Sequence, residues 1–330
     1  MPRILRSALL GAFILFANGC NNSASNRVLD VAPNAPRVLG VWGARGAQDR
    51  EFIEPRALTI SRDATGTRGF VYTTDLTGRI LQWTTTGKWV RSWKTPKLPY
   101  NQPEGPEGIC VLPNGNIAFT NTHASNFIIY SPRGKLLRKV GSYGTGRGQF
   151  LLVTGIVADR EGFIYTADYG GEFDRISKWT QDGRIVAQWI GHGEGPRQFR
   201  RPCGLAIARK TDGSDGDLLV ADIGNHRLQR LDRKTGAFRG FIGKQGRAPG
   251  QFNYPFGVAV DPRGFIYTVE YGAHRVQKWS RDGKFLATWG KPGQGANQLA
   301  NPRGIAVDND GNVYIADTKN NRIQKVKFAK

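Results

Sequence analysis

Short apolar runs separated by glycine-containing turns fill the chain from about residue 37 onward. Residues 304–307, GIAV, precede the dipeptide Asp310-Gly311, and a second apolar run, VYIA, follows at residues 313–316. Dipeptides of this kind join hairpin strands, and the three-to-four-residue spacing of an amphipathic helix is not found. The pattern therefore predicts an all-β chain built from hairpins.

This pattern recurs in six copies, each marked by a Pro-x-Gly-like triplet. The third residues of the triplets lie 51, 47, 49, 53 and 47 residues apart, at Ala57, Gly108, Gly155, Gly204, Gly257 and Gly304. Each copy reads as four short strands. A period of this length with four strands is typical of one blade of a β-propeller, in which sheets repeat around a central axis.

The ring of blades is expected to close through the N-terminal segment. The sixth copy stops after its third strand, and residues 37–43, RVLGVWG, match residues 284–290, KFLATWG, which form the fourth strand of the fifth copy. Pairing of the N-terminal segment with the last blade would remove the open edges of that sheet. We predict a six-bladed β-propeller of four-stranded antiparallel blades over residues 36–330.

The motifs of the copies resemble the NHL repeat family. They follow the pattern P-x-G-(I/V)-A-V-D, G-x-(I/V)-Y-x-x-D and N-x-R-(I/V/L)-Q, and Asn225-His226-Arg227-Leu228 lies close to the triplet that names the family. The resemblance covers about residues 37 to 326 and implies the propeller fold. It is a weak guide to function, because one propeller fold hosts enzymes, nucleic-acid binders and scaffolds.

Five copies carry an acid after the second strand and an Arg that opens the third. The acids are Asp75, Asp168, Asp222, Glu270 and Asp317, and the arginines are Arg79, Arg175, Arg227, Arg275 and Arg322. The second copy has Asn121 and Phe127 at these two places. Because loss of one partner alone would leave an uncompensated charge, the joint loss indicates that acid and Arg pair within each blade. We assign these residues a structural role.

The first residues read as an export signal. Arg3 and Arg6 precede an apolar run at residues 8–16, which is too short for the roughly 20 residues of a membrane-spanning helix. The following Ala17-Asn18-Gly19-Cys20 resembles the bacterial lipobox, which implies lipidation of Cys20, with a plain cleaved signal as the alternative. We expect a signal peptide at residues 1–19 and a flexible tether at residues 20–35. The expected location is the bacterial cell envelope, lipid-anchored on the periplasmic or outer side of the membrane.

The charge of the chain suggests acidic partners. Forty-seven Lys and Arg against 26 Asp and Glu give a formal net charge of +21. Such a charge steers association with a protein or an acidic polymer at the envelope, or with anionic lipid headgroups, although it could also serve only solubility. Nucleic acid is the usual partner of so basic a chain, but the export signal argues against it. We expect a monomer.

The central residues of the six triplets define the candidate site. Amidating lyases, to which the repeats are similar, place zinc-binding His residues there, at the mouth of the central channel. Here the positions hold Arg56, Glu107, Thr154, Cys203, Phe256 and Arg303. A catalytic zinc needs about three protein ligands. We therefore predict no metal site, no cofactor and no catalytic residue, and interpret His123, His226 and His274 as ordinary loop residues.

Once the ring closes, Arg303, Arg56 and Glu107 become neighbours at the mouth. Two Arg beside one Glu leave an excess positive charge that could bind a carboxylate or phosphate, while Phe256 and Tyr271 offer apolar contact. The alternative is that Glu107 and backbone carbonyls already satisfy both Arg. The predicted function is a non-catalytic binding or scaffold module. The alternative function is a lyase or hydrolase whose site at the mouth uses Glu107, Tyr169, Tyr271 or the loop His.

Overall fold

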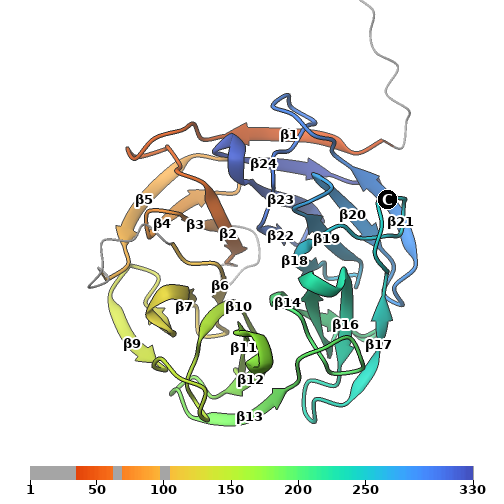
Figure 1. Cartoon of the computed structure of the whole chain (residues 1–330). Coiled ribbons are helices and arrows are strands. Elements are labelled where there is room, and N and C mark those ends of the chain that lie inside the picture. The colour runs from red at the N-terminus through yellow and green to blue at the C-terminus, as the bar shows by residue number, and fades with distance from the viewer. Residues whose placement is uncertain (1–34, 62–68, 97–104, 330) are drawn as a thin grey trace, which may run out of the picture.

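The computed structural model describes residues 35–61, 69–96 and 105–329. Six four-stranded antiparallel sheets stand around a common axis, which confirms the predicted six-bladed β-propeller (Figure 1). The predicted signal peptide, the lipidation site Cys20 and the tether up to residue 34 lie outside the described residues. The described helices are four single turns of 3-10 helix, and none could cross a membrane.

Five blades take four consecutive strands each, ordered from the channel outward. Blade 1 comprises β2 (Pro55–Ile60), β3 (Phe70–Asp75), β4 (Arg79–Thr84) and β5 (Trp89–Lys94), and blade 2 comprises β6 (Ile109–Val111), β7 (Ile117–Asn121), β8 (Asn126–Tyr130) and β9 (Leu136–Val140). Blade 3 comprises β10 (Leu152–Ala158), β11 (Ile164–Tyr169), β12 (Arg175–Trp179) and β13 (Ile185–Ile190), and blade 4 comprises β14 (Pro202–Arg209), β15 (Asp215–Asp222), β16 (Arg227–Leu231) and β17 (Phe238–Ile242). Blade 5 comprises β18 (Pro255–Val260), β19 (Ile266–Glu270), β20 (Arg275–Trp279) and β21 (Phe285–Trp289).

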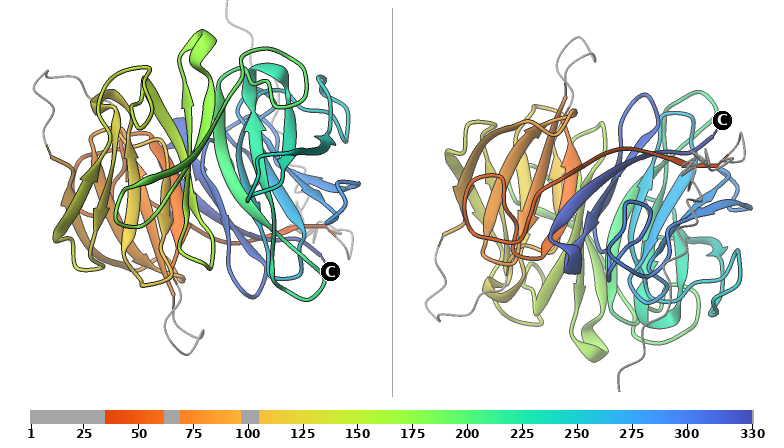
Figure 2. Two further views of the ribbon diagram at one scale, coloured as in Figure 1. Left: turned by 90° about the horizontal axis from the view of Figure 1, so that it is seen from below. Right: turned by 90° about the horizontal axis from the view of Figure 1, so that it is seen from above.

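Blade 6 is built from both ends of the chain, as predicted. It contains β22 (Ile305–Val307), β23 (Asn312–Asp317) and β24 (Arg322–Lys327), and its outermost strand is β1 (Arg37–Trp42). Strand β1 runs antiparallel to β24, from Arg37 opposite Lys327 to Trp42 opposite Ile323. The Trp42 ring meets Tyr314 edge-on at a centroid distance of 6.1 Å. Figure 2 shows β1 lying along β24 at the rim of the ring.

Apolar side chains join each blade to the next. Trp279 of blade 5, for example, lies in one buried cluster with Leu219 and Leu228 of blade 4. Trp179 of blade 3 packs in the same way against Phe127 of blade 2, with their rings 5.5 Å apart. The core is therefore a set of layers between sheets. Burial of these large rings holds the ring of blades together, because it removes much apolar surface from water.

The inner strands approach one another closely at the triplet glycines. A Cβ atom on Gly155 would lie 1.8 Å from the Cys203 carbonyl oxygen of the next blade, and one on Gly204 would lie 2.6 Å from the Phe256 carbonyl oxygen. Only glycine allows this approach without a backbone shift. The channel is therefore narrow where the triplets lie. We call this end of the channel the mouth.

Beyond the triplets, the inner strands surround a cavity of about 270 Å³. Residues of the inner strands line it, among them Leu58, Ile156 and Val258, whose side chains pack in the apolar layers between blades. At the end away from the mouth it is bordered by Asp308 and Lys325.

Candidate functional site

The predicted ion pairs within the blades are confirmed. Each of the five acids is fully buried. The pairs are Asp75–Arg79, Asp168–Arg175 at 2.8 Å, Asp222–Arg227 at 3.0 Å, Glu270–Arg275 at 2.7 Å and Asp317–Arg322 at 2.7 Å. Burial raises the pKa of Asp168, Asp222 and Glu270, and the paired Arg opposes that shift.

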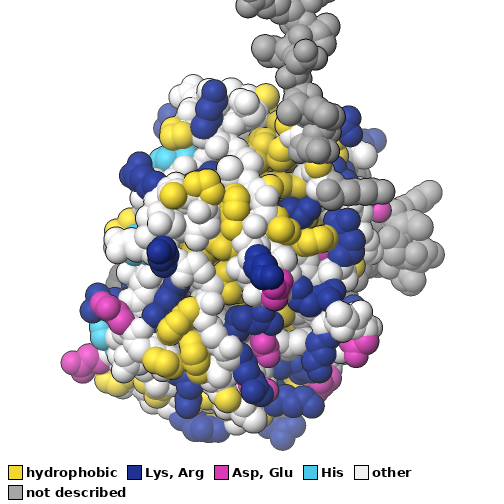
Figure 3. Space-filling view, turned by 90° about the vertical axis from the view of Figure 1, so that its right-hand side faces the viewer, with side chains coloured by type: hydrophobic (Ala, Val, Ile, Leu, Met, Phe, Trp, Pro, Cys, Tyr) yellow, Lys and Arg dark blue, Asp and Glu magenta, His cyan; other side chains and the backbone are white. Residues whose placement is uncertain are grey.

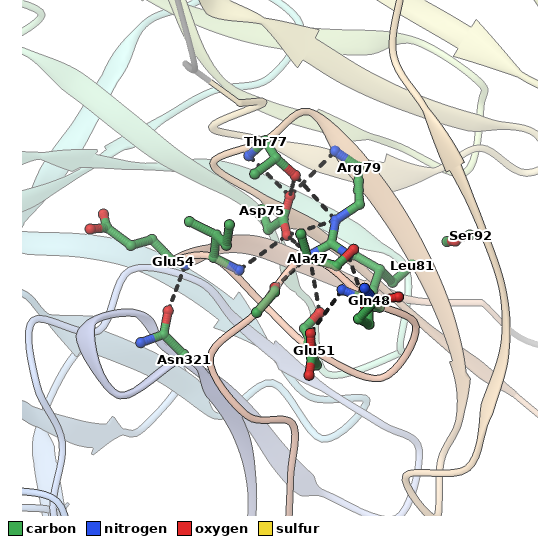
Figure 4. Close-up of polar contacts among 12 residues, drawn as sticks. Ala47, Gln48, Glu51, Glu54, Asp75, Thr77, Arg79, Leu81, Ser92 and Asn321 are labelled. Atoms are coloured by element: carbon green, nitrogen blue, oxygen red, sulfur yellow. Dashed lines mark hydrogen bonds and ion pairs between the residues drawn. The ribbon is translucent and has the colours of Figure 1, made fainter.

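The arginines of these pairs also hold the connections between blades. Arg79 donates to the carbonyl oxygens of Ala47 at 2.7 Å and of Gln48 at 3.0 Å, in the segment that leads into blade 1 (Figure 4). Arg175 does the same for Thr145 at 2.7 Å and Gln149 at 2.8 Å. One guanidinium thus satisfies a buried carboxylate and several backbone acceptors at once. This arrangement supports the structural role assigned to these residues.

The structure corrects the position that the sequence pattern assigned to the Arg equivalent in blade 2. Asn121 lies opposite Asn126 in the β7–β8 ladder, as Asp222 lies opposite Arg227 in blade 4. Phe127, which was assigned to the Arg position, is therefore one residue too far along. It packs in the core against Phe150 and Trp179. Blade 2 still lacks both charges, since Asn121 and Asn126 are neutral.

Two of the loop histidines have a function that the sequence did not reveal. His226 Nδ1 accepts a hydrogen bond of 3.1 Å from the Tyr254 N–H, and His274 Nδ1 accepts one of 3.0 Å from the Asn301 N–H. Each bond joins a blade to the next, so we call it an interblade latch. Equivalent latches run from the Glu54 N–H to Asn321 Oδ1 at 2.9 Å and from the Arg201 N–H to Asp174 Oδ2 at 3.0 Å.

The two histidine latches should weaken at acidic pH. Burial lowers the pKa of His226 and His274, and the Arg247 charge lowers that of His274 further. A protonated ring cannot accept the latch bond, and the unfolded chain takes up protons first, from about pH 6.5 downward. Stability should therefore be complete above pH ~6.5 and fall as the pH drops below it. We expect a loss of about 0.5 kcal/mol per histidine, less than a typical hydrogen bond because both rings are partly exposed.

Urea unfolding at neutral and mildly acidic pH measures this effect. The double variant His226→Asn and His274→Asn is the matched control, because Asn321 already performs the same task in blade 6. It should keep the latches and remove the histidine part of the pH dependence. An unchanged pH slope in this variant would contradict the assignment.

The five residues predicted for the mouth lie together. Glu107, just before β6, bridges the two arginines from blades 1 and 6. Its carboxylate accepts from Arg56 Nη1, and from Arg303 Nη1 at 2.8 Å and 3.2 Å. The three side chains are 12, 10 and 18% exposed, for Arg56, Glu107 and Arg303 respectively. The contact proposed in the alternative interpretation, Glu107 with both Arg, is therefore present.

Aromatic rings border this charged group on the other side. The Arg303 guanidinium lies 4.9 Å from the centre of the Phe256 ring and 5.4 Å from that of Tyr271. The two rings are tilted, with centroids 6.1 Å apart. Arg303 Nε is buried and has no hydrogen-bond partner among the described residues. We call Arg56, Glu107, Phe256, Tyr271 and Arg303 the mouth cluster; its part in binding a ligand stays a prediction.

The remaining triplet residues are enclosed by neighbouring backbone. Thr154 Oγ1 donates to the Pro202 carbonyl oxygen at 2.9 Å. Cys203 is a buried free thiol whose pKa burial raises to about 11. The Tyr169 ring lies beneath the Arg201 guanidinium, 5.0 Å from it. Within the described ranges, no three His, Cys, Asp or Glu side chains are grouped to hold a metal ion.

Fold and repeats together define a six-bladed propeller of repeated four-stranded units. A family model described as NHL repeat matches residues 252–279 and 299–326, in blades 5 and 6. The chain is a six-bladed propeller that contains NHL repeats in blades 5 and 6.

Two curated relatives share part of this sequence. Protein brain tumor of Drosophila melanogaster is 34% identical over 166 residues, which is 48% of this chain and 15% of that protein. NHL repeat-containing protein 3 of Homo sapiens is 30% identical over 176 residues, which is 49% of this chain and 47% of that protein. The matched region thus spans less than half of either relative, and the activities of those whole proteins do not transfer directly.

Similar solved structures include a streptogramin B lyase, with a TM-score of 0.58 and 17% identity over 89% of this chain and 97% of that one. A gluconolactonase from Xanthomonas campestris has a TM-score of 0.62 and 15% identity over 85% of this chain and 88% of that one. At these identities the likeness shows the fold alone, because one propeller fold supports many functions.

Proposed function

We propose that this chain is a non-catalytic binding module, lipid-anchored through Cys20 on the exported side of the bacterial envelope. Its mouth cluster binds an anionic group of a protein partner or acidic polymer. One observation carries the proposal: at the channel mouth the Arg303 guanidinium pairs with Glu107 through Nη1, while its buried Nε has no hydrogen-bond partner among the described residues.

The surroundings of Arg303 favour a second anion. Its guanidinium is mostly removed from water, and a charge in such a place is stabilised by an added hydrogen-bonded carboxylate or phosphate. Phe256 and Tyr271 line the same guanidinium, so a ligand that carries an apolar group beside its anion would contact both. An acidic peptide segment with apolar neighbours has this chemistry.

The alternative enzyme would use the same mouth. Glu107 is the carboxylate of the mouth cluster, and both of its oxygens accept hydrogen bonds from Arg303. An acid or base must reach the proton that it transfers. A carboxylate enclosed by two guanidinium groups is better placed to hold them in position than to transfer a proton, which favours the binding module.

A pair of substitutions tests the mouth. Replacement of Arg56 and Arg303 by Ala should weaken the binding of a glutamate-rich peptide by more than about tenfold, equivalent to 1.4 kcal/mol. Glu107→Gln should strengthen the same binding, because it removes the internal competitor for both guanidinium groups. Isothermal titration calorimetry measures both effects.

Three controls complete that test. Lys244→Ala with Lys291→Ala removes two exposed charges elsewhere, and should leave peptide affinity nearly unchanged. The triple variant Arg56→Gln, Glu107→Gln and Arg303→Gln removes all three charges and leaves no carboxylate without its partners. If its melting temperature equals that of the parent, a loss of peptide binding is not caused by a loss of folding. Equal peptide affinity in the parent and the double Ala variant would show that the mouth is not the site.

A further inference from the structure

Blade 2 has an unusual charge balance. Residues 108–158, which run from blade 2 into β10 of blade 3, contain five Lys and Arg but no Asp or Glu. Four of these basic residues lie on β9 or on the turn before it, namely Arg133, Lys135, Arg138 and Lys139, and all four are exposed. The outer strand of this blade thus carries concentrated positive charge.

None of these four side chains has an ion-pair partner among the described residues, whereas basic residues on or beside the outer strands of blades 3 and 4 do. Arg184 pairs with Asp182 at 2.9 Å and Arg239 with Asp232 at 2.8 Å. Figure 3 shows the side of the molecule that carries β17 and β21, where acidic side chains lie among the basic ones. Blade 2 therefore differs in this respect from blades 3 and 4.

Strand β9 is also unusual in its exposure. Its first four residues are all exposed, whereas β21 alternates half-buried and exposed positions. Leu136 and Leu137 are 49% and 45% exposed, at adjacent positions of the strand among the basic residues, so that each sheet face at this edge carries one of them. Other outer strands also expose apolar side chains, but not at adjacent positions: β13 exposes Val186 and Ile190, and β21 exposes Leu286.

The positive surface continues onto blade 1. Lys88, Arg91 and Lys94 on or beside β5 are exposed and also lack an ion pair within the described ranges. The two blades touch here, because the Trp93 ring lies 6.4 Å from the Tyr130 ring. Asp49, hydrogen-bonded to Ser92, is an acid at the border of this surface. We call the surface the basic edge: Lys88, Arg91, Lys94, Arg133, Lys135, Leu136, Leu137, Arg138 and Lys139.

We propose that the basic edge docks on an anionic phospholipid surface. Clustered Lys and Arg are attracted to anionic headgroups, and apolar side chains between them enter the headgroup region. The two leucines favour a lipid surface over a soluble polyanion, which has no apolar layer to receive them. The proposal rests on the proposed location at a membrane, but it concerns neither the anchor nor the mouth cluster.

Vesicle binding tests this surface on the full chain carrying Cys20→Ser, so that no lipid anchor contributes. The parent should bind vesicles of phosphatidylcholine with phosphatidylglycerol, and bind phosphatidylcholine alone at least about tenfold more weakly. Lys135→Gln, Arg138→Gln and Lys139→Gln together should lower the affinity for the anionic vesicles at least about tenfold. Leu136→Ser with Leu137→Ser should lower the part of the binding that survives high salt, since salt screens only the charges.

The matched control removes three exposed charges from blades 4 and 5, with Lys244→Gln, Arg247→Gln and Lys291→Gln. It has the same net charge as the blade 2 variant and should bind like the parent. Equal losses in the two variants would overturn the proposal, because overall charge would then explain the binding. Equal affinity for the two vesicle types would overturn it too, as would tight binding of soluble polyglutamate without binding of vesicles. These outcomes leave the mouth test untouched, because no mouth residue is changed.

Discussion

Deletion of residues 36–43 should lower the free energy of unfolding by at least about 5 kcal/mol, a large part of the stability of a typical domain. The deletion removes β1 and therefore leaves the backbone of β24 as an unpaired sheet edge. It also removes Trp42, which packs edge-on against Tyr314. Differential scanning calorimetry of the deletion variant against the parent measures the loss.

Two further variants make this result specific. Deletion of residues 21–35 should change the melting temperature little, because that segment precedes the first strand of the predicted propeller. Trp42→Ala keeps the backbone pairing and should lose less than the roughly 3–5 kcal/mol typical of a fully buried Trp, because the Trp42 ring is only partly buried. Equal melting temperatures for the two deletions would refute closure of the ring by β1.

Replacement of Arg175 by Asn should lower the free energy of unfolding by about 3–5 kcal/mol. Arg175 and Asp168 are both fully buried, so the variant leaves a carboxylate without its counter-charge in the interior. Burial already raises the pKa of Asp168, and loss of the guanidinium removes the opposing influence. The destabilisation should therefore shrink as the pH falls and Asp168 becomes protonated in the folded state.

Blade 2 supplies the control for this prediction. Asn121 and Asn126 occupy the equivalent places there, so the double variant Asp168→Asn with Arg175→Asn copies a pair that the fold accepts. Chemical denaturation should show the double variant to be more stable than Arg175→Asn at neutral pH, with a coupling energy of about 1–3 kcal/mol. A double variant no more stable than the single one would show that Arg175 acts mainly through the connecting loop.

The fold could be predicted from the sequence because the same pattern of strands and turns occurs in six copies. Ambiguity in any one copy, such as the missing Pro before Thr154, is removed by the others. The assignment of Phe127, one residue away from the true Arg position, shows the limit of this comparison between copies. The spacing from acid to Arg varies among blades, from Asp75–Arg79 to Asp168–Arg175, so the register of blade 2 follows only from its ladder.

The mouth cluster could be predicted as a neighbourhood but not as a set of contacts. Closure of the ring places blades 6, 1 and 2 side by side, which brings Arg303, Arg56 and Glu107 together. That Glu107 bridges both arginines, and that Arg303 also lies against Phe256 and Tyr271, depends on side-chain rotamers set by packing. The latch of His226 escaped prediction because its partner, Tyr254, belongs to the next blade.

The pairing of β1 with β24 in blade 6 also determines when the ring of blades can close. Strand β1 is synthesised first and β24 last, yet they pair directly. Through most of synthesis β1 has no partner, and the ring closes only after nearly the whole chain is available. Contacts between such distant segments form slowly, because a long loop must be closed first. Closure should therefore come late in folding, and a chain still being synthesised must keep β1 from pairing elsewhere until β24 is available.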